Sequence, residues 1–194
     1  MPAETESFIT IVSGLPRSGT AMMMRMLEAG GLPVVVDNIR AADEDNPAGY
    51  YEFEPVKQTS QNDSWLPAAV GSAVKMVYRL LYELPPGYRY RVLFMQRKLE
   101  EVLVSQQKML ARSGKAASSA ASDEQMSRLF RAELQKFAAW ISTRPEMRML
   151  EVSYNELLAA PQPIAQKIND FLGGELDTQA MVRVVDPALY RNRL

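Results

Sequence analysis

The 194-residue sequence contains no cysteine and no histidine. The absence of cysteine excludes disulfides, a thiolate nucleophile and cysteine-held metal sites. The absence of histidine removes the commonest general base and the commonest zinc ligand. We therefore expect Glu, Asp, Lys or Tyr to carry any acid–base chemistry.

The sequence also lacks a strong net charge and a long apolar run. Its 22 Lys and Arg residues against 23 Asp and Glu residues leave a formal charge of −1, which indicates neither a nucleic acid nor an acidic membrane as partner. No apolar run approaches the roughly 18 residues that span a bilayer. The acidic segment 1–7 has no apolar core like that of a signal peptide. We expect a cytoplasmic protein without a membrane span, and the oligomeric state stays open.

What is present is an alternation of strand-like and helical patterns. Five short runs rich in Val, Ile, Leu or Met predict strands at Phe8–Ser13, Pro33–Val36, Ala73–Tyr78, Tyr90–Met95 and Met147–Val152. Their apolarity is continuous, which is typical of strands buried on both faces of a parallel sheet. Helical patterns lie between them at Gly19–Ala29, Leu99–Leu110, Glu124–Thr143 and Pro163–Leu172. The pattern predicts a single α/β domain over residues 1–194, a three-layer doubly wound sandwich with a mainly parallel sheet of about five strands.

The most informative segment joins the first predicted strand to the first predicted helix. It reads Gly14-Leu15-Pro16-Arg17-Ser18-Gly19-Thr20. The N–H groups and the positive dipole end of a helix N-terminus bind phosphate, and flanking glycines let the backbone approach the anion closely. In a doubly wound sheet this loop lies at the carboxyl ends of the strands, where ligands bind. The plain alternative is a strand–turn–helix connection whose Arg17 faces solvent.

The loop differs from that of nucleotide hydrolases. A hydrolytic P-loop reads G-x-x-x-x-G-K-[ST], with a Lys at the outer phosphates and a Ser or Thr on magnesium. Aligned on the two glycines, those positions are Thr20 and Ala21, and the cation lies inside the loop at Arg17. The fourth predicted strand ends at Gln96 and Arg97 and not at a magnesium-holding carboxylate. The loop therefore predicts a phosphate-like group held without a metal, and a P-loop kinase stays as a weaker alternative.

The segment Leu15–Thr20 resembles the 5′-phosphosulfate loop of sulfotransferases, which often reads P-[KR]-S-G-T-T. The family's second Thr is Ala21 here. The resemblance implies 3′-phosphoadenosine 5′-phosphosulfate as the sulfuryl donor, adenosine 3′,5′-bisphosphate as its product, and no metal. It also implies that the donor is bound by Leu15, Pro16, Arg17, Ser18, Gly19 and Thr20.

A second element resembles the donor-binding half of the same family. Arg97 follows the fourth predicted strand and Ser105 lies eight residues later, as in the sulfotransferase element that binds the 3′-phosphate. A guanidinium can grip a phosphate with two hydrogen bonds, and a hydroxyl can add another. The plain alternative is a surface Arg and a helical Ser. The basic, Gly-rich C-terminal segment of the cytosolic branch is missing, and Arg191 and Arg193 are candidates to replace it.

A weaker similarity runs from Tyr154 to Pro161 and on to Phe171–Gly173. It resembles the Y-E-D-L-x-x-x-P…F-L-G element that follows the last core strand of many sulfotransferases. We interpret it as structural.

Catalysis without a metal requires cationic side chains and a base. The resemblance assigns Arg17 to the leaving group. Lys75, a charge in an otherwise apolar strand, resembles a Lys near the reaction centre in tyrosyl-protein and bacterial branches, and the alternative is an ordinary end-of-strand Lys. The base candidates are Glu52 and Glu54, in the segment Asn46–Glu54, where acceptor contacts are expected. An extended segment would point both the same way, and we prefer Glu52.

Together these features predict a metal-independent sulfotransferase that moves a sulfuryl group from the nucleotide donor to an unidentified hydroxyl or amine acceptor. The alternative is a catalytically inactive nucleotide-binding or scaffold protein on the same fold. Two further segments lack a regular pattern. Asp37–Gln61 is too long for a simple connector, and the low-complexity stretch Ser113–Ser122 is expected to be a linker or, in a sharper hypothesis, a lid.

Overall fold

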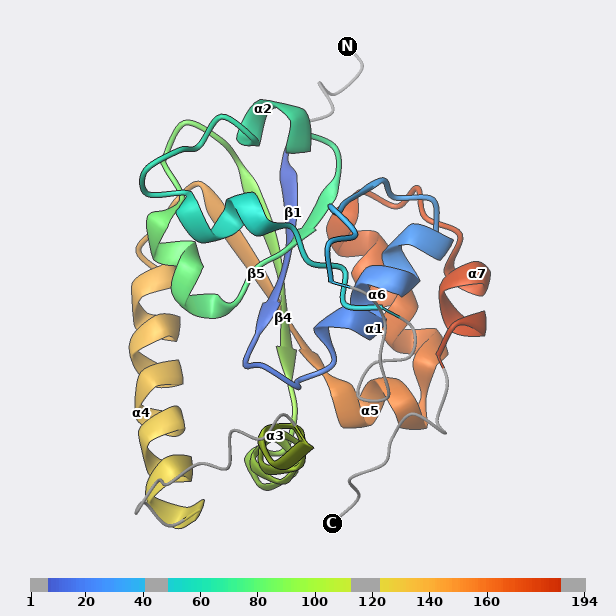
Figure 1. The fold of residues 1–194 in the computed structure, drawn as a ribbon. Coiled ribbons are helices and arrows are strands. Elements are labelled where there is room, and N and C mark those ends of the chain that lie inside the picture. Colours follow the sequence, from blue (N-terminus) through green and yellow to red (C-terminus); the bar gives the residue numbers. More distant parts are fainter. Residues whose placement is uncertain (1–6, 41–48, 113–122, 186–194) are drawn as a thin grey trace.

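The computed structural model describes residues 7–40, 49–112 and 123–185, and its central feature is a five-stranded sheet (Figure 1). The strands are β1 (Ile9–Gly14), β2 (Val34–Val35), β3 (Ala73–Lys75), β4 (Tyr90–Gln96) and β5 (Met147–Ser153). Their order is β2-β3-β1-β4-β5, and each neighbouring pair runs parallel. The predicted α/β fold with a parallel sheet of five strands is therefore confirmed.

Helices cover both faces of this sheet. The α-helices are α1 (Thr20–Ala29), α2 (Leu66–Ala69), α3 (Leu99–Arg112), α4 (Asp123–Ile141), α5 (Tyr154–Ala159), α6 (Pro161–Leu172) and α7 (Thr178–Arg183). Two 3₁₀ helices, η1 (Glu54–Gln58) and η2 (Tyr78–Glu83), lie in the connections around β3. In Figure 1, α1, α6 and α7 lie on one side of the strands, and α4 and the 3₁₀ helices lie on the other.

The predicted strands agree with the observed ones to within one residue at each end, except at β3. That strand ends at Lys75, and the chain turns into η2 at Tyr78, so the predicted run to Tyr78 is three residues too long. The early end matters because it places Lys75 at the carboxyl edge of the sheet, beside Val12 of β1. A charged side chain is less costly at such an edge than in the sheet interior.

Two apolar clusters hold the layers together. On the α1 side, α1 packs against the sheet, α6 and α7, and it buries Met22, Met23, Met24, Met26 and Leu27. The close approach of α7 is visible at Gly30, where an added Cβ would lie 2.8 Å from Met181 Cγ. The other cluster gathers β1, β4, α3, α4 and the 3₁₀ helices, with Phe94 stacked on Phe137. The α/β sandwich is thus filled on both faces of β1.

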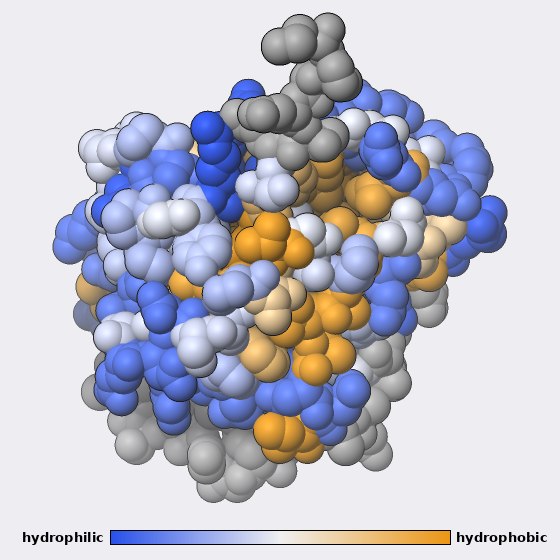
Figure 2. All heavy atoms as spheres, turned by 90° about the horizontal axis from the view of Figure 1, so that it is seen from above, coloured by the Kyte–Doolittle hydropathy of each residue, from blue (hydrophilic) through white to orange (hydrophobic). Residues whose placement is uncertain are grey.

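The two edges of the sheet differ. Figure 2 views the edge at which the strands begin, where hydrophobic side chains gather in the middle of a mostly polar face. The opposite edge, where the strands end, carries the loop between β1 and α1, the start of α3 and the start of α5 (Figure 1). The predicted site residues lie at this carboxyl edge.

Some expectations fall outside the described residues. They concern the Ser113–Ser122 segment, the tail residues Arg191 and Arg193, and the first three residues of the Asn46–Glu54 segment. Within the part of the chain that the structure describes, no helix combines the length and the apolarity needed to cross a membrane.

Candidate active site

The loop between β1 and α1 turns sharply at three positive-φ residues. Gly14 has φ 149°, Arg17 has φ 70° and Gly19 has φ 100°. A Cβ on Gly14 would lie 2.6 Å from both the Met95 carbonyl oxygen and Ser18 Oγ, so only glycine fits where the loop leaves the strand. Gly19 precedes α1, and no side chain caps that helix end. The loop therefore presents backbone N–H groups at an uncapped helix N-terminus, which is an anion-binding arrangement.

Arg17 bends back from this loop onto α3. Its Nε donates a hydrogen bond to Ser105 Oγ at 3.0 Å, although the two residues are 88 positions apart in the sequence. Ser105 is only 3% exposed. The structure thus brings together the loop cation and the helical Ser that the sequence singled out separately.

Arg97 lies between α3 and the same loop. Its Nη1 donates to the Arg17 carbonyl oxygen at 3.2 Å, and its Nε donates to Glu101 Oε2 at 2.9 Å. The guanidinium carbon lies 4.7 Å from the centre of the Tyr154 ring, a cation–π contact. The Arg97 side chain is 7% exposed and Glu101 is fully buried. Arg97 is therefore at the predicted place, and its contacts run to the protein interior.

Three members of this cluster were missed from the sequence. Glu101 lies four residues after Arg97, a helical spacing that favours an ion pair and could have been noticed. Tyr154 and Asn155 begin α5, directly after β5, and the sequence analysis treated their segment as structural. Asn155 Nδ2 donates to both Glu101 carboxylate oxygens, at 3.3 Å and 3.4 Å. Nothing in the local sequence shows that α5 reaches Arg97, because the neighbourhood arises from the β4–β5 pairing.

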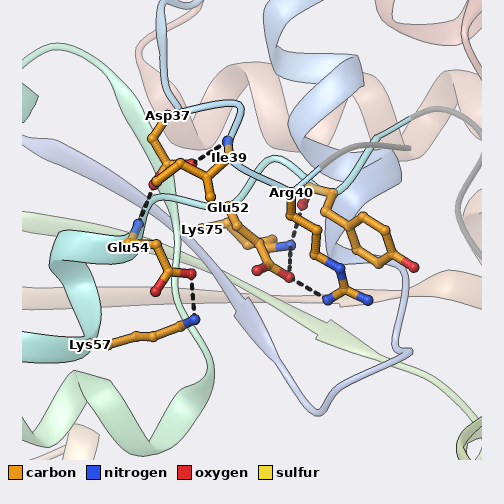
Figure 3. Close-up of polar contacts among 8 residues, drawn as sticks. Asp37, Ile39, Arg40, Glu52, Glu54, Lys57 and Lys75 are labelled. Carbon is orange, nitrogen blue, oxygen red and sulfur yellow. Dashed lines mark hydrogen bonds and ion pairs between the residues drawn. The ribbon is translucent and has the colours of Figure 1, made fainter. Parts of the chain in front are cut away.

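A second polar cluster surrounds Lys75, at the end of β3 (Figure 3). Lys75 Nζ donates to the Tyr50 carbonyl oxygen and lies 3.9 Å from Glu52 Oε1. The same carboxylate oxygen accepts a hydrogen bond from Arg40 Nη1 at 2.9 Å. The Arg40 guanidinium carbon stacks 3.4 Å from the centre of the Tyr50 ring. Glu52 is therefore held between two cations at the carboxyl edge of the sheet.

Asp37 ties the two backbone segments of this cluster to each other. Its carboxylate accepts hydrogen bonds from the N–H groups of Ile39, at 3.0 Å, and Glu54, at 2.6 Å (Figure 3). Its own N–H donates to the Glu52 carbonyl oxygen at 3.1 Å. The backbone hydrogen bonds from Glu54 and Ile39 lower the pKa of Asp37 from its usual value. This turn fixes the segment on which Glu52 is presented to Lys75.

Glu52 and Glu54 do not point the same way, which corrects the expectation from the sequence. Glu54 begins η1, and its carboxylate pairs with Lys57, three residues later. Figure 3 shows this pair apart from Lys75, whereas the Glu52 side chain extends toward Lys75. The reason is local: the backbone enters a 3₁₀ turn at Glu54, so the two-residue repeat of an extended chain ends there.

Burial lowers the pKa of Lys75 to about 8. The desolvation of its half-buried ammonium group is the main cause, and Glu52 opposes the shift by favouring the charged form. The positive charges of Arg40, Lys57 and Arg17 lower the pKa further. Lys75 is paired in register with Val12 of β1, two residues before the β1–α1 loop begins at Gly14.

No protein-family model matches the sequence, and a search of curated proteins finds no match. Solved structures do match. One is the sulfotransferase domain of the Synechococcus PCC 7002 olefin synthase, at a TM-score of 0.52 and 14% identity over 100% of this chain and 86% of that one. Another is a sulfotransferase domain from the curacin biosynthetic pathway, at a TM-score of 0.54 and 14% identity over 92% of this chain and 78% of that one. The chain has the sulfotransferase fold. The resemblance inferred from the loop is thus confirmed at the level of the fold.

The loop of this sulfotransferase fold fits an anionic group. Ser18 Oγ is buried and has no hydrogen-bond partner among the described residues. Ser18 lines a hollow of about 230 Å³, together with Leu15, the end of β4 and Arg97. An unmatched buried hydroxyl, glycines without room for a side chain and an uncapped helix end are the features that a bound phosphate would use.

The described residues also show what the fold's carboxyl edge lacks. No three Asp or Glu side chains come together there in a way that could hold a metal ion, as far as residues 7–40, 49–112 and 123–185 show. Four cations, Arg17, Arg40, Lys75 and Arg97, lie at this edge, where Glu52 and Glu101 pair with them and Asp37 holds the adjoining backbone.

Proposed function

We propose that this protein is a sulfotransferase that moves a sulfuryl group from 3′-phosphoadenosine 5′-phosphosulfate to a hydroxyl or amine acceptor without a metal ion. The observation that carries the proposal is the convergence of two clusters at one sheet edge. Arg17 of the β1–α1 loop donates a hydrogen bond to Ser105 of α3. Lys75, at the end of the neighbouring strand β3, forms an ion pair with Glu52. The likeness in fold supports sulfuryl transfer as the reaction class. The cations Arg17 and Lys75 and the carboxylate of Glu52 support a transfer without a metal ion.

The donor half of the proposed site consists of Leu15, Pro16, Arg17, Ser18, Gly19 and Thr20, together with Arg97 and Ser105. When bound, the nucleotide would supply the sulfuryl group. The loop N–H groups and Ser18 Oγ would hold the 5′-phosphate oxygens. Arg17 and Lys75 would place positive charge where negative charge develops on the leaving phosphate, which is the role that metal ions play in phosphoryl transfer.

The acceptor half of the proposed site centres on Glu52. Its carboxylate is the one beside Lys75, so it is the group placed to accept the proton of the attacking hydroxyl or amine. Arg40 and the Asp37 turn would orient it. Lys75 would then hold charge on the leaving side and Glu52 would hold the proton on the acceptor side, as an in-line transfer requires.

The first test is calorimetric titration with adenosine 3′,5′-bisphosphate in the absence of magnesium, with ATP and magnesium as the comparison. We expect binding of the bisphosphate without metal, and about tenfold weaker binding for Arg17→Ala because a charge-assisted hydrogen bond is lost. Arg148→Ala is the matched control, since it removes one exposed cation from β5, away from the loop. Absence of binding, or equal affinity in Arg17→Ala and the wild type, would remove the proposed donor site.

A second candidate function is a nucleotide-binding or scaffold protein on the same fold. The observation that favours it is that Ser105 and Arg97 are almost fully buried and already engaged by Arg17 and Glu101. Incubation with labelled donor and a panel of alcohols, phenols and amines separates the two. Donor binding together with no transfer to any acceptor, and no hydrolysis of the phosphosulfate, would favour the scaffold.

A further inference from the structure

We infer that Arg97 acts on the donor through the shape of the β1–α1 loop, as a positioning residue supported by Glu101, Tyr154 and Asn155, and not by direct contact with a 3′-phosphate. The inference rests on the proposed function, because it concerns how the same donor is held. It assigns a role to three residues that the sequence analysis left aside or treated as structural.

Arg97 is bound on two sides within the protein. One nitrogen, Nη1, donates to the Arg17 carbonyl oxygen, and another, Nε, donates to Glu101. The Tyr154 ring lies against the guanidinium face. Arg97 lines the hollow beside Ser18, but only 7% of its side chain is exposed there, whereas its link to the loop backbone is direct.

The loop backbone needs such a hold at Arg17. A φ of 70° is costly for a residue with a side chain, and it persists only where surrounding contacts fix it. The hydrogen bond from Arg97 fixes the carbonyl group of that residue. The same backbone conformation directs the Arg17 side chain to Ser105 and leads into Ser18 and Gly19. A change at Arg97 is therefore transmitted to the groups that hold the 5′-phosphate.

Tyr154 holds the other end of the loop. Its ring packs so closely on Gly19 that a Cβ there would lie 2.3 Å from Tyr154 Cδ2. The ring thus contacts both Arg97 and Gly19, the residue before α1. Together, Arg97 and Tyr154 link the start of α5 to both Arg17 and Gly19 of the loop.

Glu101 compensates the charge of Arg97. It is fully buried, it forms an ion pair with Arg97, and Asn155 donates to both of its oxygens. A buried guanidinium paired in this way is positioned firmly, and much of its field is cancelled at the ligand. This arrangement is expected of a residue that holds the loop in place. It is not expected of a residue that distinguishes nucleotides with a 3′-phosphate from those without one.

The inference predicts a specific pattern of affinities. Adenosine 3′,5′-bisphosphate and adenosine 5′-monophosphate share the 5′-phosphate and differ in the 3′-phosphate. If Arg97 shapes the loop, its substitution weakens both nucleotides by the same factor. If Arg97 binds the 3′-phosphate, its substitution weakens only the bisphosphate, and the affinity ratio of the two nucleotides falls.

The experiment titrates both nucleotides into the full-length wild type and into Arg97→Lys, Glu101→Gln and Asn155→Ala. Lys98→Ala, at an exposed neighbouring position, is the control for the loss of a cation close to Arg97. Circular dichroism confirms that each variant is folded before titration. For Arg97→Lys we expect about tenfold weaker binding of both nucleotides, since Lys cannot contact the Arg17 carbonyl group and Glu101 in the same geometry. Asn155→Ala, the mildest change, is expected to weaken both by about threefold.

Weaker binding of both nucleotides at a constant affinity ratio in the Arg97, Glu101 and Asn155 variants, together with unchanged affinity in Lys98→Ala, supports the inference. Unchanged affinity for both nucleotides in folded Arg97→Lys overturns it. A loss confined to the bisphosphate in Arg97→Lys overturns it. Tighter and selective binding of the bisphosphate in Glu101→Gln also overturns it, because it would mean that Arg97, once released, reaches the 3′-phosphate. If the wild type binds neither nucleotide, the proposed donor site itself is wrong.

Discussion

At the scale of single residues, the two candidate bases illustrate how backbone conformation decides chemistry. Glu52 and Glu54 have the same side chain, two positions apart, and the sequence alone does not separate them. The turn made by Asp37 and the start of η1 do so, because they direct Glu52 to Lys75 and Glu54 to Lys57. Only Glu52 is therefore placed in the cluster at the sheet edge.

Substitution of these two residues gives a direct test. We expect Glu52→Gln to lower turnover by about a hundredfold or more, since general-base catalysis contributes factors of this order. Donor affinity should change little, because Glu52 lies on the proposed acceptor side. Glu54→Gln is the matched control and should retain near wild-type turnover. Steady-state rates with a transferred label measure both, and equal loss in the two variants would contradict the assignment.

At the scale of elements, the loop and α1 form a unit that depends on α5. Gly19 begins this unit with a positive φ and lies under the Tyr154 ring. Such short helices as α5 and α7 were not predicted, because six residues show too little periodicity to stand out. The longer α1, α3, α4 and α6 were predicted to within two residues at each end.

The packing on Gly19 predicts a difference between two glycine substitutions. Gly31 also has a positive φ, of 94°, but no atom lies within 4 Å of its added Cβ. Gly31→Ala should therefore cost about 1 kcal/mol of unfolding free energy from backbone strain alone. Gly19→Ala should cost about 1–3 kcal/mol more, because Tyr154 is buried and has to shift. Urea unfolding measures both, and equal losses would contradict the packing argument.

At the scale of the whole molecule, the layers converge on one edge of the sheet. Apolar clusters cover both faces of β1, and Lys75 lies partly buried at the end of the neighbouring strand β3. Its ammonium group loses hydration on folding, so the fold itself sets its protonation. The unfolded chain releases this proton near the usual lysine value of 10.5, and the folded chain releases it near 8.

This difference predicts how stability depends on pH. Between about pH 8 and 10.5 the unfolded state holds the Lys75 proton and the folded state does not, so this residue makes stability rise with pH in that window. Lys75→Met removes the effect. We expect its free energy of unfolding, minus that of the wild type, to fall by up to about 3 kcal/mol from pH 7 to pH 10.5. Urea unfolding across this range measures the difference.

Lys167→Met is the control for this experiment, because it removes an exposed lysine of α6 that is not among the charges acting on Lys75. A free-energy difference between Lys75→Met and the wild type that stays constant with pH would show that Lys75 is not desolvated in the folded protein.

The features that could be predicted from the sequence are those that depend on a local pattern of residues. Continuous apolar runs predicted the strands of a parallel sheet, and the glycines around Arg17 predicted an anion-binding loop at its carboxyl edge. The partners of those residues were decided by tertiary structure alone. Arg17 meets Ser105, and Arg97 meets Tyr154, only because β1, β4 and β5 lie side by side. Spacing along a chain encodes periodicity, whereas contacts between distant residues follow from the order of strands in the sheet, which no short stretch of sequence specifies.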